Sequence, residues 1–194
     1  MTNALSSLLT EIRACEICKE GLPHHEPRPI VEGTSKAKIM IVGQAPGSVV
    51  HASGVPWDDA SGRNLRRWLG VTDEQFYDPN LFAIVPMGFC YPGKGKSGDL
   101  PPRPECAPKW HKPLFDLMPE IKLTLLIGLY AQTYYLGDRR KKTLTETVTN
   151  YKEYLPEYLP LVHPSPRNGI WQRKHPWFEA EVVPALQQVV KTFI

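Results

Sequence analysis

The four cysteines of this sequence are the residues best suited to metal chemistry. Cys15 and Cys18 are three positions apart, so on a helix end their thiols face the same way. Fifteen residues separate Cys90 from Cys106, and the two pairs use every cysteine of the chain. Four thiolates suit tetrahedral zinc or an iron–sulfur cluster. Zinc knuckles usually supply two closely spaced pairs of cysteines, and this chain has only one such pair. The alternative to a metal site is four unrelated buried thiols.

A second group of candidates follows short apolar runs. Residues 37–42 end at a Gly-Gln-Ala-Pro-Gly segment, 43–47, and residues 158–162 end at His163, which a Pro-Ser-Pro segment follows. Ligands of open α/β proteins bind at the carboxyl ends of the sheet strands. The segments that follow these two predicted strands therefore predict a binding site at one edge of a sheet.

The elements that position these residues alternate between strands and helices. Strands are predicted at 37–42, 81–85, 123–127 and 158–162, the last weakened by Pro160. Helical spacing or capping signals occur at 8–12, at 64–69 with Gly70 as the stop, at 72–75, and at 176–191 with an interruption at Pro184. This order predicts an α/β fold, a parallel sheet covered by helices on both faces.

The segment between the second pair of cysteines, 92–104, is rich in proline and glycine. It has little means of packing itself, so we expect a loop closed at its two ends and presenting Lys94, Lys96 and Arg103 outward. Contact with phosphates is one interpretation of these cations, and an ordinary solvated loop is the other.

Composition limits the class of protein. The 194 residues favour one domain, 1–194, and 23 Lys and Arg against 20 Asp and Glu give a net charge of +3. This small net charge excludes a protein that binds nucleic acid through its overall positive charge, as histones do. It allows a local basic surface that contacts nucleic acid. No apolar run reaches the ~20 residues of a membrane span, and the start has no signal-peptide pattern. We expect a cytoplasmic protein whose thiols stay reduced. Nothing in the sequence indicates an oligomer, so we also expect a monomer.

Three motifs in this order resemble the uracil-DNA glycosylase superfamily, especially its iron–sulfur branches, families four and five. Residues 41–47 are similar to its first motif, and residues 163–168 (His-Pro-Ser-Pro-Arg-Asn) to its second. The cysteine spacing is similar to the 4Fe–4S ligand set of those branches. The resemblance spans nearly the whole chain, from the cysteine helix to the final helix.

The resemblance implies a fold, a cofactor and an activity. The fold is an α/β/α sandwich around a four-stranded parallel sheet, and the cofactor is a 4Fe–4S cluster on the four cysteines, with zinc as the alternative. The activity is hydrolysis of the N-glycosidic bond of a nucleotide flipped out of DNA. Trp57 occupies the place of an aromatic residue that stacks on uracil, with a half-buried core tryptophan as the alternative, and His163 that of a histidine stabilising the departing base. Gly43, Gln44 and Ala45 would then line the base pocket.

The catalytic carboxylate is one departure from the family pattern. The best-known family has Asp third in its first motif and family four has Glu second, where this chain has Ala45 and Gln44. Family five carries Gly-Asp-Ala-Ser-Gly in the next segment, which Asp59 and the following Ala-Ser-Gly match. We therefore expect Asp59 to position the attacking water, with Asp58 as the nearby substitute. The alternative is that Asp59 only caps the helix that begins near Gly62.

A second departure concerns the base. The iron–sulfur families read uracil with an Asn shortly before the third cysteine, and residues 85–90 contain none. Pro86 offers no donor there. Base selection is then expected from Gln44 and backbone groups, or the substrate is a base other than uracil.

Other residues are candidates for contact with DNA. Arg167 and Asn168 lie in the loop that the family inserts into the minor groove. His51 follows the first loop and is a candidate for contact with sugar or phosphate. The remaining candidates for phosphate contact are Ser61, Ser165, Lys94 and Lys96.

Three functions follow from these patterns. The first is a DNA glycosylase of base-excision repair, carried by the three ordered motifs and Asp59. The second is a non-catalytic protein on the same fold that binds DNA or damaged bases, motivated by the two departures. The third is a zinc protein that handles phosphate with its Gly-Pro loop.

Overall fold

A parallel sheet forms the centre of the molecule. The computed structural model describes residues 2–194, and the side chains of all of these except 2, 3 and 24. Within this range one sheet has four strands in the order β2-β1-β5-β6, all paired in parallel: β1 (Ile39–Val42), β2 (Phe82–Ile84), β5 (Leu123–Ile127) and β6 (Tyr158–Leu161). The four predicted strands and the α/β class are confirmed.

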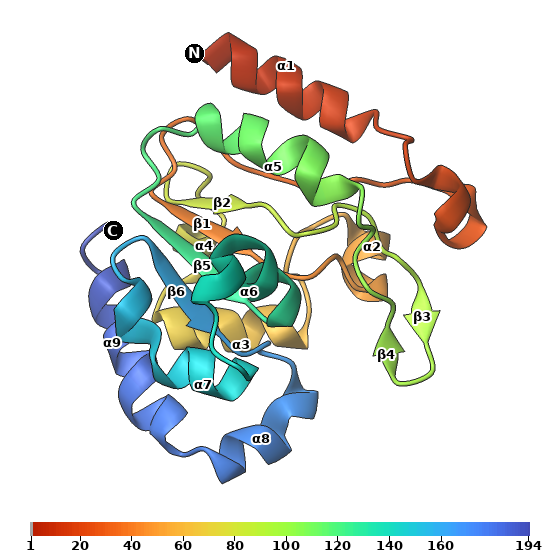
Figure 1. Cartoon of the computed structure of the whole chain (residues 1–194). Helices are drawn as coiled ribbons and strands as arrows, with labels where there is room; N and C mark the ends of the chain where they lie inside the picture. Colours follow the sequence, from red (N-terminus) through yellow and green to blue (C-terminus); the bar gives the residue numbers. More distant parts are fainter. Residues whose placement is uncertain (1) are drawn as a thin grey trace.

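Helices cover both faces of this sheet because alternate strand residues point in opposite directions. Ile39 and Ile41 join one apolar core, and Met40 and Val42 join the other. The first core includes α3 (Ala60–Leu69), α4 (Asp73–Phe76), α7 (Leu144–Thr149), η4 (Tyr151–Tyr154), the π-helical turn η6 (Phe178–Val182) and α9 (Val183–Val190). The second includes α1 (Thr2–Arg13), α5 (Cys106–Asp116) and α6 (Leu129–Leu136). Figure 1 shows α1 and α5 on one side of the sheet and α3 and α9 on the other, which confirms the sandwich.

Both prolines that weakened the predicted elements are accommodated. Pro160 lies inside β6, which is an edge strand, and there the missing N–H costs no pairing with a further strand. Pro184 lies in the first turn of α9, where its missing N–H is tolerated; the backbone stays helical from Phe178 to Val190 and changes from π- to α-helical at Val183, in place of the expected kink or interruption. The stop at Gly70, with φ of 69°, and the capping box of Thr72 and Gln75 are confirmed.

The segment 92–104 is not the unpaired loop that the sequence predicted. It contains an antiparallel hairpin, β3 (Lys94–Gly95) and β4 (Gly98–Asp99), which Leu100 N closes by donating to Gly93 O at 2.8 Å. Lys94 and Lys96 are exposed as expected. Arg103 instead packs against Gly21 and pairs with Glu105 at 2.7 Å.

Short helices connect the remaining parts of the chain. Their bounds are α2 (Ser48–Ser53), α8 (Gly169–Lys174), η1 (Lys19–Gly21), η2 (Pro23–His25), η3 (Gly137–Arg139) and η5 (Pro166–Asn168). None of the helices in residues 2–194 has both the length and the apolar character needed to cross a membrane.

A buried histidine supports the loop that leaves β2. His111 of α5 is 2% exposed, with Nε2 at 3.0 Å from Pro86 O and Nδ1 at 2.8 Å from the Tyr135 hydroxyl. The carbonyl of Pro86 can only accept, so Nε2 carries the proton and Nδ1 accepts from Tyr135. Burial lowers the pKa of His111 to about 4, so its imidazole is neutral at neutral pH.

This buried imidazole makes stability depend on pH. The unfolded chain protonates His111 near pH 6.5, whereas the folded chain does so only near pH 4, so acid between these values favours unfolding. The His111 contribution to the free energy of unfolding should fall by about 2 kcal/mol from pH 7.5 to pH 5. Urea titrations of the wild type and of His111→Gln check this, with His175→Gln as the matched control. An equally steep pH dependence in His111→Gln would contradict it.

Candidate active site

A cavity of about 440 Å³ opens at the carboxyl edge of the sheet. Its walls come from the loops that follow β1, β2 and β6, from the turn before α3 and from the β3–β4 hairpin. Nine predicted site residues line it: Gly43, Gln44, Ala45, Trp57, Asp59, Ser61, His163, Ser165 and Arg167. The structure thus brings together three segments that are distant in the sequence.

The turn before α3 holds Trp57 in an unusual backbone conformation. Trp57 has φ of 58°, a left-handed value that costs a bulky residue about 1–3 kcal/mol. Its carbonyl oxygen packs on the first turn of α3, where a Cβ on Gly62 would lie 1.7 Å away. Its indole lies on the first loop, at 2.9 Å from where a Cβ on Gly43 would be. Glycine at 62 and 43 therefore makes room for Trp57 at the cavity wall.

Asp59 both caps α3 and lines the cavity. One carboxylate oxygen, Oδ1, accepts a hydrogen bond of 2.7 Å from Gly62 N. This bond fixes the side chain and leaves the second oxygen for other partners. The two interpretations of Asp59 in the sequence, helix cap and water-positioning group, are therefore compatible. Asp58 is exposed and is not part of the cavity wall.

His163 presents a defined donor to the cavity. Its Nδ1 accepts the N–H of Ser165 at 3.2 Å, so in the neutral ring the proton is on Nε2. Burial lowers the pKa of His163, and the nearby carboxylates of Asp59 and Asp99 oppose this only in part. The imidazole is therefore neutral at neutral pH. Its ring centroid lies 5.9 Å from that of Trp57.

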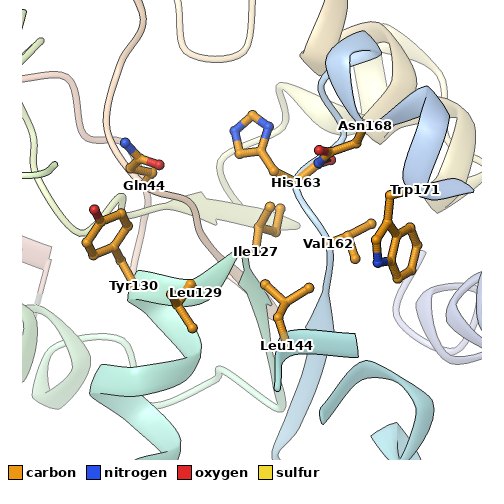
Figure 2. A pocket seen from close by; sticks show the side chains of 10 residues that line it. Gln44, Ile127, Leu129, Tyr130, Leu144, Val162, His163, Asn168 and Trp171 are labelled. Carbon is orange, nitrogen blue, oxygen red and sulfur yellow. Dashed lines mark hydrogen bonds between the residues drawn. The ribbon is translucent and has the colours of Figure 1, made fainter. Parts of the chain in front are cut away.

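A smaller, mostly apolar cavity of about 210 Å³ adjoins the first one. Both cavities share Gln44 and His163 in their walls. Figure 2 shows Gln44 and Tyr130 on one side and Asn168 and Trp171 on the other. Asn168 Nδ2 donates to His163 O at 2.7 Å, so this predicted DNA contact also holds the histidine loop in place.

The hairpin is a part of the site that the sequence did not predict. Ser97, Gly98 and Asp99 line the larger cavity, and Gln44 Nε2 donates to Leu100 O at 3.1 Å. A Cβ on Gly98 would lie 3.4 Å from Arg167 Nη1, so the hairpin spans the cavity from the first loop to the histidine loop. The only signal was a Lys-Ser pair between two glycines, a spacing suited to a two-residue turn.

Two other residues, Pro86 and His51, offer the cavity few polar groups. Pro86 lines the cavity at the exit of β2, but it has no N–H and His111 already bonds its carbonyl. The ring of His51 faces Tyr91 at 5.8 Å, and its buried Nδ1 has no hydrogen-bond partner among the described residues. His51 is not in the cavity wall.

Neighbouring thiols lie close enough to contribute to the raised pKa of Cys18, Cys90 and Cys106. Cys106 is affected by the other three, and Cys90 by Cys15 and Cys18. Burial raises the pKa of Cys90 and of Cys106 to about 12, so these thiols ionise only beside a positive partner such as a metal. Cys106 Sγ accepts the N–H of Phe89 at 3.4 Å. Among the side chains that the structure describes, no three of His, Cys, Asp or Glu are placed to hold a single metal ion. An all-cysteine set suits an iron–sulfur cluster, whose several irons separate its ligands more widely than one ion does.

Comparison with known proteins gives a consistent result. The model of the uracil DNA glycosylase superfamily matches residues 30–187. A protein of Saccharolobus solfataricus named type-4 uracil-DNA glycosylase is 27% identical over 175 residues, covering 83% of this chain and 76% of the relative. A protein of the same name from Sulfurisphaera tokodaii is 25% identical over 174 residues, covering 84% and 75%.

The close approach of Gly62 to Trp57 is testable through stability. Gly62→Ala places a Cβ at 1.7 Å from the Trp57 carbonyl oxygen, so the turn or the helix must move. We expect a loss of at least about 3 kcal/mol in the free energy of unfolding. In the control Gly169→Ala the nearest atom is Arg173 Nη1 at 3.6 Å, and α8 should keep or gain stability. Chemical denaturation measures both variants, and equal stabilities would contradict this packing.

Proposed function

Because this chain belongs to the uracil DNA glycosylase superfamily, we propose that it hydrolyses the N-glycosidic bond of a deaminated base, uracil foremost, in DNA repair. The observation that carries the proposal is the convergence of Trp57, Asp59 and His163 on one cavity. These side chains supply a stacking surface, a carboxylate and a neutral donor. Both relatives bear the name of this activity.

The reaction begins with a nucleotide extruded from the helix, which costs its stacking and pairing energy. The indole of Trp57 replaces part of that stacking, and its backbone conformation is already set before the base arrives. The hairpin wall at Ser97–Asp99 and the first loop at Gly43–Ala45 enclose the base. Enclosure excludes bulk water, so the polar groups of the site act more strongly.

Bond cleavage leaves positive charge on the deoxyribose and negative charge on the base. The free oxygen of Asp59 stabilises the sugar cation and holds the attacking water. As the water oxygen bonds to C1′ in place of the base, the water passes one proton to this carboxylate. The Nε2–H of His163 donates to the oxygen of the base on which the negative charge develops. A neutral histidine suits this role because its proton stays available near pH 7.

We propose that the base is selected by groups other than those of the loop that follows β2. Pro86 has no N–H to donate to the base, and His111 already engages one lone pair of its carbonyl. Gln44 is the polar side chain of the first loop, and its donation to Leu100 O leaves the amide oxygen as an acceptor for a ring N–H of the base. Asp99 is a second acceptor at the rim. We therefore propose that Gln44, backbone groups and the hairpin select the base.

The surface around the cavity provides contacts for the DNA backbone. Arg167 and Asn168 form the wedge loop, and Arg167 is exposed beside the hairpin. Phosphate contacts come from Ser61 and Ser165 in the cavity wall and from the exposed Lys94 and Lys96.

We propose that the protein acts as a monomer in the cytoplasm, where DNA and reduced thiols are both present.

We also propose that Cys15, Cys18, Cys90 and Cys106 hold a 4Fe–4S cluster. When bound, the cluster supplies a covalent tie between the end of α1 and the two ends of the hairpin segment. The chemistry of hydrolysis needs no electron transfer, so this role is structural. Cys90 and Cys106 would thereby fix the wall that carries Asp99.

The carboxylate assignment is tested by a substitution that keeps the helix cap. Asn is as good an N-cap as Asp, so Asp59→Asn should preserve stability while single-turnover release of uracil falls about 100-fold. Asp58→Asn makes the same change at the neighbouring residue and tests the alternative carboxylate. Loss of release in Asp58→Asn, with Asp59→Asn unchanged, would transfer the role to Asp58.

The cluster is tested by its composition. Anaerobically purified wild type should contain iron and acid-labile sulfide in equal amounts, with visible absorption that Cys90→Ala loses together with solubility. Ser97→Ala, a small change in the same hairpin segment, should keep the cluster. Stoichiometric zinc in place of iron, or a soluble and fully active Cys90→Ala protein, would contradict the proposal.

A further inference from the structure

A buried cation lies directly behind the active-site turn. Arg66 of α3 is 8% exposed and is not in the wall of either cavity described above. Its Nε lies 2.6 Å from Asp73 Oδ1, and its guanidinium packs over the rings of Phe76 and Tyr77 at 5.3 and 5.6 Å. The Asp73 side chain is 76% exposed, so solvent screens this ion pair and it is a weak source of stability. The remaining contacts of Arg66 indicate another role.

Those contacts reach two consecutive carbonyl groups of the turn. Arg66 Nη1 donates to Trp57 O at 3.2 Å and to the Tyr77 hydroxyl at 3.4 Å. The Tyr77 hydroxyl in turn donates to Pro56 O at 3.1 Å. The peptides on both sides of Trp57 Cα are therefore fixed from behind, on the side away from the cavity.

The same turn requires such support. Trp57 has φ of 58°, which a residue with a large side chain adopts only where its surroundings enforce it. Gly62 removes the steric obstacle, but a glycine exerts no attraction. The guanidinium of Arg66 supplies a charge-assisted hydrogen bond to the carbonyl that the left-handed turn directs inward. Asp59 follows two residues later, so the direction of its side chain depends on this peptide.

We propose that Arg66, assisted by Tyr77, is a positioning residue that holds Trp57 and Asp59 in the geometry of the reaction. Arg66 acts on them only through the backbone of the turn. The inference rests on the proposed function for its kinetic consequence, whereas its structural consequence for Trp57 does not.

The test compares two neighbouring arginines of α3. Arg66→Lys keeps a cation but loses the planar fork, and Tyr77→Phe keeps Arg66 but removes the bond to Pro56 O. Arg67→Lys is the matched control, because Arg67 is bonded to Glu179 at 3.0 and 2.8 Å and does not contact the turn. The single-turnover rate constant for uracil release should fall about tenfold to 100-fold in Arg66→Lys and less in Tyr77→Phe, with DNA affinity unchanged. Arg67→Lys should match the wild type.

A second readout is independent of activity. In protein labelled with fluorotryptophan, the ¹⁹F resonance of Trp57, assigned with Trp57→Phe, should shift or broaden in Arg66→Lys and stay in place in Arg67→Lys. If the wild type releases no base, the proposed function fails while this spectrum still decides the positioning. If Arg66→Lys does not fold, Tyr77→Phe carries the test. An unchanged rate with an unchanged Trp57 resonance, or an equal loss in Arg67→Lys, would overturn the inference.

Discussion

The site depends on one close contact, that between the Trp57 carbonyl and the first turn of α3. Residue 62 has no room for a side chain because that oxygen occupies the position of its Cβ. Gly62 thereby permits the left-handed conformation of Trp57, in which the indole lies against the first loop. The same turn brings Asp59 to the N-terminus of α3, where Gly62 N fixes one carboxylate oxygen. The close packing of this turn on α3 thus goes with the places of two proposed reacting groups.

The sheet supplies the third group and the wall opposite. His163 follows β6, which is two strands from β1 in the sheet order, and its ring reaches the same cavity as the first loop. The hairpin closes the space between these loops through the contacts of Gln44 with Leu100 and of Gly98 with Arg167. Since Cys90 and Cys106 bound the hairpin segment, a cluster on the cysteines would support the pocket as well as the fold.

Local sequence signals accounted for much of this arrangement. Apolar runs predicted the four strands, and Gly70 and the box of Thr72 and Gln75 ended or began helices as expected, because each rests on contacts within a few residues. The sequence favoured Asp59 over Asp58 through the family-five pattern, but it could not show that Asp59 lies in the cavity wall and Asp58 outside it, because this depends on the backbone of Trp57. It also missed Asp99 and Arg66. Asp99 reaches the cavity on a hairpin that the bond between Gln44 and Leu100, 56 positions apart, ties to the first loop. Arg66 reaches the turn through the Trp57 carbonyl, a contact that depends on the irregular backbone between them.

The most direct test of the account is the identity of the product. Anaerobically purified wild-type protein is incubated with matched DNA duplexes containing uracil, hypoxanthine or xanthine, and the free base is detected by mass spectrometry alongside the abasic strand. Free base and abasic DNA are expected in equal amounts from the uracil duplex. Protein with a full cluster that binds these duplexes but releases no base from any of them would contradict the proposed function.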